Sequence, residues 1–255
     1  MNPVDKFNNR AEKINSLLCV GLDTVAENQF EFNKKIIEQT HEFAAAYKPN
    51  AAFYEARGSK GLDELKKTMD YLHENHPDIF TIYDAKRADI GSTNKGYVAA
   101  IFDWLGFDAI TLHPYFGKEA LEPFLEREDK VSIILCRTSN PGAGEFQDLE
   151  SGGKSFWQIV AEKVSIDWNA SNNCMLVVGA TYPNEMKKVR EIAGDMTFLV
   201  PGIGAQGGDV KAAVESGLNS QKKGMIINSS RGIILAEDPA AEARKLRDEI
   251  NDYRR

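Results

Sequence analysis

Short apolar runs that alternate with longer amphipathic segments constrain the fold of this chain more than any other feature. The apolar runs predict buried strands at 17–21, 45–52, 80–84, 109–113, 132–136, 175–179, 198–202 and 225–228. The amphipathic segments predict helices at 31–44, 62–74, 94–105, 156–170, 184–192, 209–216 and 238–253. Strands that alternate with helices indicate βα units and a parallel sheet. Eight strands fit a closed (β/α)8 TIM barrel better than an open doubly wound sheet.

Length and composition favour one domain of ordinary globular type. The chain has 255 residues and no Pro-rich or Ser-rich linker, so we expect residues 1–255 to form a single α/β domain. Its net charge of −7 argues against a nucleic-acid-binding surface, which needs a basic patch. The polar N-terminal segment does not resemble a signal peptide, and no apolar run approaches the roughly 18 residues that span a membrane.

The three cysteines indicate the compartment. Cys19, Cys136 and Cys174 each lie within an apolar run. Such positions predict buried, reduced thiols rather than catalytic ones, because a reactive cysteine needs exposed electropositive surroundings. We therefore expect a cytoplasmic protein.

A charged motif lies at the end of the third predicted strand, in the stretch YDAKRADIGST at 83–93. Side chains alternate along a strand, so Asp84 and Lys86 point to the same side, and Asp89 follows where the chain turns. Two carboxylates around one ammonium group are unfavourable at a strand end unless the charges are well paired or used in chemistry. The motif is open to two interpretations at this point, a catalytic array or a salt-bridged strand end.

Other polar residues follow the remaining predicted strands. Because the ends of parallel strands meet at one mouth of a barrel, where catalytic groups of this architecture lie, these residues are candidates for one site. They are Asp23, Lys48, His113, Arg137, Thr138, Ser139, Thr181, Pro201, Ser230 and Arg231.

The last two strand ends predict a phosphate site. The stretch PGIGAQGGD at 201–209 is a Gly-rich turn that leads into a helix, and NSSRG at 228–232 places Arg231 beside small residues. Glycine permits close backbone approach, free N–H groups bind anions, and arginine forms paired hydrogen bonds to phosphate. The glycine-rich turn alone is equally consistent with a plain tight turn, and Arg231 at the next strand end favours phosphate.

The segment 138–155, rich in Gly, Ser and acidic residues, is the one long irregular stretch that we expect. A loop of this length in a compact domain is either functional or disordered, and we favour a cover over the active site. Metal-ligand spacings such as HExxH are absent from the sequence. The lysines interleaved with the carboxylates argue against Mg²⁺, so we expect no metal.

Six motifs together resemble one enzyme family. CVGLD, AAYKPNAAFYE, YDAKRADIGST, TSNPG, PGIGAQGGD and NSSRG are similar in order and spacing to the longer bacterial branch of the orotidine 5′-monophosphate decarboxylases. One departure is Ala88, where the family pattern has Gly. A methyl group is tolerated there if the backbone φ stays below zero.

The resemblance implies a reaction and a catalytic array. The reaction is decarboxylation of orotidine 5′-monophosphate to uridine 5′-monophosphate, the last step of de novo UMP biosynthesis, without a cofactor. Lys48, Asp84, Lys86 and Asp89 would form an alternating charged array in which Lys86 protonates C6 of the pyrimidine.

The resemblance also implies the residues that bind the substrate. Asp23 and Lys48 would bind ribose hydroxyls, and Ser139 would hydrogen-bond the pyrimidine edge. Asp89, Ile90 and Thr93 would reach into the active site of a neighbouring subunit, which makes the enzyme a homodimer with shared sites. The phosphate end of the site would consist of Pro201, Gln206, Ser230 and Arg231.

Two other functions are compatible with parts of this pattern. A sugar-phosphate decarboxylase or aldolase of the same superfamily shares the Asp-x-Lys-x-x-Asp array. Such an enzyme uses Mg²⁺, however, and lacks the TSNPG motif and Gln206, which would bind a pyrimidine. A non-catalytic nucleotide-binding protein on a barrel is the second alternative. The intact charged array argues against it, because unused buried charges are destabilising.

Overall fold

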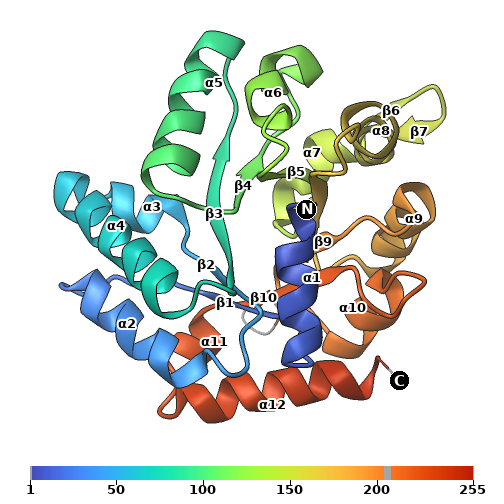
Figure 1. Cartoon of the computed structure of the whole chain (residues 1–255). Helices are drawn as coiled ribbons and strands as arrows, with labels where there is room; N and C mark the ends of the chain where they lie inside the picture. Colours follow the sequence, from blue (N-terminus) through green and yellow to red (C-terminus); the bar gives the residue numbers. More distant parts are fainter. Residues whose placement is uncertain (1, 204–207, 255) are drawn as a thin grey trace.

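Eight parallel strands form a closed barrel in a computed structural model of the protein, which describes residues 2–203 and 208–254 (Figure 1). This arrangement confirms the predicted (β/α)8 barrel. Around the barrel, in the order in which neighbours pair, the strands are β1 (Leu18–Gly21), β10 (Met225–Ser229), β9 (Phe198–Val200), β8 (Cys174–Val178), β5 (Val131–Arg137), β4 (Ala109–Leu112), β3 (Phe80–Arg87) and β2 (Ala46–Lys48).

Helices surround the barrel on its outside (Figure 1). Each predicted helix overlaps an observed one, although two of them end in π-helical turns, η1 (Ala99–Trp104) and η3 (Lys163–Trp168). The other helices that follow or precede the barrel strands are α1 (Val4–Lys13), α2 (Gln29–Thr40), α3 (Ala51–Glu55), α4 (Gly58–Asn75), α5 (Gly91–Val98), α6 (Gly117–Leu125), α8 (Phe156–Glu162), α9 (Pro183–Ala193), α10 (Val210–Gly217), α11 (Arg231–Ile234) and α12 (Pro239–Asp252).

The strand predicted at 45–52 is wrong in its second half. The strand β2 ends at Lys48, and the helix α3 begins at Ala51. The side chain of Asn50 accepts a hydrogen bond from the backbone N–H of Ala52 at 3.1 Å, which starts the helix. The segment AAFYE at 51–55 is mostly apolar, and its Ala and aromatic residues suit a buried strand as well as a helix. Its composition therefore did not reveal the helix.

Four of the helices given above, α1, α3, α6 and α11, have no counterpart among the predicted ones. The helix α1 lies across the barrel in Figure 1, and the ring of its Phe7 packs edge-on against Phe80, the first residue of β3. It therefore covers the end of the barrel where strands begin. The helix α6 carries Pro123 in its interior, a residue that disfavours helix and weakened the sequence signal.

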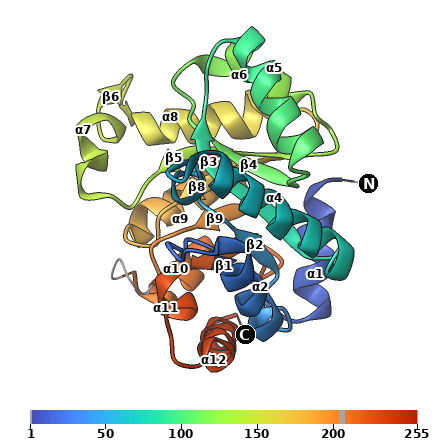
Figure 2. The same ribbon diagram turned by 90° about the vertical axis from the view of Figure 1, so that its left-hand side faces the viewer.

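The segment 138–155 is more ordered than predicted. After β5 it forms a 3₁₀ turn, η2 (Pro141–Ala143), the short helix α7 (Gly144–Gln147), and a two-stranded hairpin of β6 (Glu150–Ser151) and β7 (Lys154–Ser155). Gly152 and Gly153 make the hairpin turn with φ of 61° and 78°. In Figure 2, α7 and the hairpin lie on the side of the barrel opposite α1.

The three cysteines are unpaired and buried, as predicted. Burial raises the pKa of the Cys19 and Cys136 thiols to about 12, so both stay protonated and unreactive at neutral pH. None of the helices that the structure describes is both long enough and apolar enough to span a membrane.

Candidate active site

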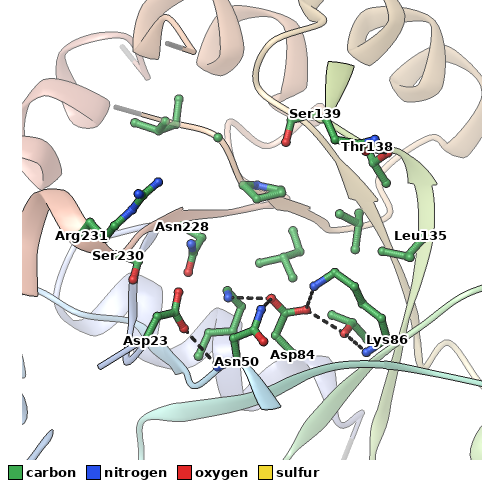
Figure 3. A pocket seen from close by; sticks show the side chains of 18 of the residues that line it. Asp23, Asn50, Asp84, Lys86, Leu135, Thr138, Ser139, Asn228, Ser230 and Arg231 are labelled. Carbon is green, nitrogen blue, oxygen red and sulfur yellow. Dashed lines mark hydrogen bonds and ion pairs between the residues drawn. The ribbon is translucent and has the colours of Figure 1, made fainter. Parts of the chain in front are cut away.

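A cavity of about 510 Å³ opens where the barrel strands end (Figure 3). It brings together most of the polar residues that the sequence placed at strand ends. The predicted site residues that line it are Asp23, Lys48, Asp84, Lys86, Ser139, Pro201, Ser230 and Arg231. Gln206, the remaining residue of the predicted phosphate end, lies outside the described residues.

The carboxylate of Asp84 lies between two ammonium groups. Its Oδ2 accepts from Nζ of Lys48 at 2.9 Å, and its Oδ1 accepts from Nζ of Lys86 at 2.5 Å. Both lysines therefore point at one carboxylate, and the predicted pairing of Asp84 with Lys86 on one face of the strand is confirmed. Lys48 is almost fully buried, whereas the Lys86 side chain is 49% exposed and faces the cavity.

Two further polar side chains, which the sequence analysis did not single out, hydrogen-bond to the carboxylate of Asp84. The amide nitrogen of Asn50 lies 3.3 Å from Oδ2 (Figure 3), and the hydroxyl of Thr111 lies 2.9 Å from Oδ1. Both residues line the cavity. Asn50 lies two residues after Lys48, the last residue of β2, so its position after a strand could have identified it from the sequence. Thr111 lies within β4, and its position gives no such signal.

These contacts fix the charge states of the buried pair. Burial alone would raise the pKa of the Asp84 carboxyl, but the ammonium groups of Lys48 and Lys86 outweigh burial and hold this pKa well below its usual range. Burial alone would lower the pKa of Lys48, and the carboxylates of Asp84 and Asp23 outweigh it and raise this pKa. Asp84 is therefore ionised and Lys48 protonated at neutral pH.

The backbone of Lys86 is in an unusual conformation. Its φ is 47°, in the left-handed region that residues with a Cβ seldom adopt, and the strand register shifts between Tyr83 and Arg87. The backbone N–H of Lys86 donates to the Thr111 hydroxyl at 3.0 Å, outside the regular ladder. Ala88 has no positive φ, so the condition for tolerating its methyl group is met. Strain of this kind at Lys86 is typical of functional sites.

The opposite side of the cavity carries a cation, Arg231, that forms no ion pair within the described part of the chain. Arg231 begins α11 directly after β10, is exposed, and lies across the cavity from Lys86 in Figure 3. Ser230 beside it packs against Gly21, where a Cβ would lie 2.7 Å from the Ser230 Cβ. The turn between β9 and α10 also borders this side through Pro201 and Gly202. An anionic group fits here.

Part of the cavity lining is an apolar wall. It consists of Leu135, Val177 and Leu199, which strand periodicity alone did not distinguish from the core. Thr138 and Ser139 lie above Leu135 in Figure 3. A flat ring with polar edges suits this space, because the wall packs against the ring face while the hydroxyl groups bind its edge.

Three predicted site residues do not line the cavity of this chain. Asp89, Ile90 and Thr93 lie on the turn after β3 and the start of α5, and the Ile90 side chain is exposed. Oδ1 of Asp89 accepts from the Ile90 backbone N–H at 2.6 Å. Their assignment to a neighbouring subunit's site stays a prediction.

Three other strand-end residues, His113, Arg137 and Thr181, are also absent from the cavity wall. His113 directly follows β4, and its ring lies 5.9 Å from the ring of Phe116, centroid to centroid. Burial lowers the pKa of His113 below its ordinary value. Thr181, two residues after Gly179, has a buried hydroxyl with no partner in the described part of the chain. Within those same residues no group of three or more His, Cys, Asp or Glu side chains is arranged to hold a metal ion.

Comparisons with known proteins agree with this geometry. Residues 16–246 match the model of the orotidine 5′-phosphate decarboxylase / HUMPS family. The chain is 43% identical to the orotidine 5′-phosphate decarboxylase of Dechloromonas aromatica over 100% of both chains, and 46% identical to that of Azoarcus sp. (strain BH72) over 94% of both. It superposes on the OMP decarboxylase structure of Leishmania donovani with a TM-score of 0.94 and 43% identity, covering 100% of this chain and 99% of the other.

Proposed function

The chain belongs to the orotidine 5′-phosphate decarboxylase / HUMPS family and is a carboxy-lyase, and from this premise we propose its substrate, its mechanism and its assembly. The substrate is orotidine 5′-phosphate, the product is uridine 5′-phosphate, and the reaction is the last step of de novo UMP biosynthesis. Residues 1–255 act as one domain.

One observation carries this proposal. The carboxylate of Asp84 holds the exposed ammonium group of Lys86 at 2.5 Å on one side of the cavity, while Arg231 faces the cavity from the other side (Figure 3). A nucleotide with a reacting ring at Lys86 and a phosphate at Arg231 spans this arrangement. The apolar wall of Leu135, Val177 and Leu199 lines the same cavity.

The residue types suit loss of CO₂ from a carbon that cannot delocalise charge. When the bond from C6 to the carboxylate breaks, CO₂ leaves and the electron pair stays on C6. The Lys86 ammonium group stabilises this pair electrostatically and then donates its proton to C6. Asp84 holds the ammonium group of Lys86 in place beside C6, and the positive charge of Lys48 balances the negative charge of Asp84. Lys86 recovers its proton from solvent, so the cycle needs no cofactor.

Most binding residues are assigned from the cavity that they line. Asp23 and Lys48 bind ribose hydroxyls, Ser139 binds the pyrimidine edge, and Pro201, Ser230 and Arg231 form the phosphate end. Gln206 is added to the phosphate end from the family resemblance alone. The phosphate lies far from the reacting carbon, so binding energy released there is used to desolvate and close the site.

A homodimer with shared sites completes the array. Asp89 and Thr93 lie outside their own cavity, and Ile90 between them exposes 59% of its surface. The family resemblance assigns all three residues to the partner's site, and the exposure of Ile90 leaves it free to make that contact. In the dimer, Asp89 extends the series Lys48, Asp84, Lys86 into the partner's site, and its charge near the substrate carboxylate favours expulsion of CO₂.

The buried free cysteines support a reducing, cytoplasmic location, and the net charge of −7 supports a small-molecule substrate rather than nucleic acid.

The decisive experiment mixes the purified protein with orotidine 5′-phosphate and follows absorbance of the orotate ring, with and without EDTA. We expect turnover that survives EDTA, with release of one CO₂ per UMP. A sugar-phosphate decarboxylase or aldolase that depends on Mg²⁺ would leave the nucleotide unchanged and lose its own activity in EDTA. A non-catalytic binding protein would bind UMP without any turnover.

A further inference from the structure

Arg137, the last residue of β5, is a buried cation that the proposed chemistry does not use. Its side chain is only 3% exposed. A buried charge without a partner is strongly destabilising, so the identity of its partners is informative.

The partners of Arg137 lie on two different segments. The guanidinium carbon is 4.1 Å from the centroid of the Tyr182 ring, which follows β8. Nη1 is 3.2 Å from Oδ1 of Asp148 and Nη2 is 3.3 Å from Oδ2 of the same carboxylate. Asp148 directly follows α7 and its side chain is 51% exposed. It is the one carboxylate paired with Arg137 in the described ranges, and it belongs to the segment over the cavity.

The neighbouring Gln147 connects this ion pair to the cavity wall. Its Oε1 accepts from the backbone N–H of Thr138 at 3.0 Å, and its Nε2 donates to the Thr138 hydroxyl at 2.8 Å. Gln147 and Thr138 both line the cavity. A change in the position of α7 therefore moves Thr138 as well.

Ser139 is fixed from the other side. The backbone N–H of Gly179, at the end of β8, donates to the carbonyl of Arg137 at 2.8 Å. A Cβ on Gly179 would lie 2.8 Å from the Ser139 Cβ and 2.9 Å from its backbone nitrogen. Ser139 thus packs directly on a glycine, and its position depends on the backbone that Arg137 and Asp148 hold.

We propose that Arg137 and Asp148 are positioning residues: their ion pair, the loop anchor, holds α7 against the end of β5 and thereby aligns Thr138 and Ser139 with the ring of the substrate. Displacement of α7 would leave the buried guanidinium without its carboxylate, so the anchored arrangement is favoured. The assignment of a ring to this side of the cavity rests on the proposed function.

The loop anchor predicts a selective effect on ligands. Arg231 lies across the cavity from Thr138 and Ser139 in Figure 3, so the phosphate end does not depend on the loop anchor. UMP places a ring beside Thr138 and Ser139, whereas ribose 5-phosphate has no ring. Loss of the loop anchor should therefore weaken the binding of UMP and leave the binding of ribose 5-phosphate unaffected.

The test compares Asp148→Asn with Glu145→Gln in the full chain. Both residues are exposed acids on α7 or directly after it, and Glu145 forms no ion pair with the described residues. We expect Asp148→Asn to weaken UMP binding and lower kcat/KM about tenfold, because a charge-assisted hydrogen-bonded pair is lost at a partly exposed site. Ribose 5-phosphate affinity should change less than about twofold by the same argument, and Glu145→Gln should match the parent.

Hydrogen exchange without ligand separates this proposal from the proposed function. Amides of 138–148 should exchange about tenfold faster in Asp148→Asn than in Glu145→Gln, and this difference should be larger than that for amides of the barrel strands. Arg137→Lys keeps the positive charge but cannot contact both carboxylate oxygens of Asp148 as the guanidinium does. It should therefore give an intermediate exchange rate. Equal exchange in Asp148→Asn and Glu145→Gln, or equal losses on UMP and ribose 5-phosphate, would overturn the loop anchor. A parent that fails to decarboxylate orotidine 5′-phosphate contradicts the proposed function, and the exchange rates then decide on the anchor alone.

Discussion

Thr111 donates its hydroxyl proton to Oδ1 of Asp84 at 2.9 Å. The same hydroxyl oxygen accepts the backbone N–H of Lys86 at 3.0 Å, so one side chain supports both the carboxylate and the left-handed backbone of the lysine. Thr111 is almost fully buried on β4, so its hydroxyl is shielded from water and held by these two hydrogen bonds. It is therefore placed to set the direction in which Lys86 enters the cavity.

We expect Thr111→Val to lower kcat for orotidine 5′-phosphate by about 10- to 100-fold with a small change in KM, because Lys86 loses its support but the binding residues stay. Steady-state kinetics and circular dichroism measure this. Thr111→Ser keeps the hydroxyl and should retain most activity. A fully active Thr111→Val protein would show that Asp84 alone positions Lys86.

Replacement of Asp84 by Asn should destabilise the protein by about 3–5 kcal/mol, because buried Lys48 loses its charge partner. Urea unfolding at pH 7 measures the loss. The Lys86 side chain is more exposed than that of Lys48 and contributes less to it.

The pH dependence of this loss has a definite sign. The pKa of Asp84 is lowered in the folded state, so its contribution is complete above the unfolded value of about 4 and decreases as pH falls through the folded pKa. The stability difference between parent and Asp84→Asn should be constant from about pH 5 to 8 and narrow below about pH 4. A difference that grows on acidification would contradict the ionised state of Asp84.

Arg231→Ala tests the phosphate end. We expect a large loss of kcat/KM on orotidine 5′-phosphate and almost no change on the nucleoside orotidine, which has no phosphate. The loss of kcat/KM is measured for both substrates with the parent and the variant, and the two losses are compared. Equal losses on the two substrates would mean that Arg231 supports the fold or the chemistry directly.

A mixture of two inactive variants tests the shared site. Lys86→Ala and Asp89→Ala, after complete subunit exchange, should regain roughly a quarter of parental activity, because about half of the dimers are mixed and each mixed dimer has one intact site. A mass-tagged partner confirms exchange. No recovery after complete exchange would show that Asp89 acts in its own subunit or in neither.

The barrel was predictable because each buried strand of a parallel sheet is a short apolar run, and several of these runs are followed by a polar residue that lines the cavity. This is why Asp23, Lys48 and Arg231 were found from the sequence. Thr111 was missed because one threonine within an apolar strand does not differ in sequence from a residue that packs in the core. Its role depends on the register of β3 beside β4, which no local pattern records.

The order of the segment after β5 was missed for a similar reason. Its glycines and polar residues are typical of an irregular loop, and α7 is stabilised by contacts with residues outside its own turn. The ion pair of Arg137 with Asp148 is one such contact. The left-handed φ of Lys86 was equally invisible, because the sequence favours an extended strand at that point.

The central claim is that Lys86 stabilises charge at C6 and protonates it. Its most direct test is the turnover of orotidine 5′-phosphate by Lys86→Ala, with folding checked by circular dichroism and UMP affinity. The account predicts a loss of kcat by a factor on the order of 10⁴ or more in a folded protein, because the proton donor and the cation beside C6 are both removed. Turnover within about tenfold of the parent would contradict the assignment of Lys86.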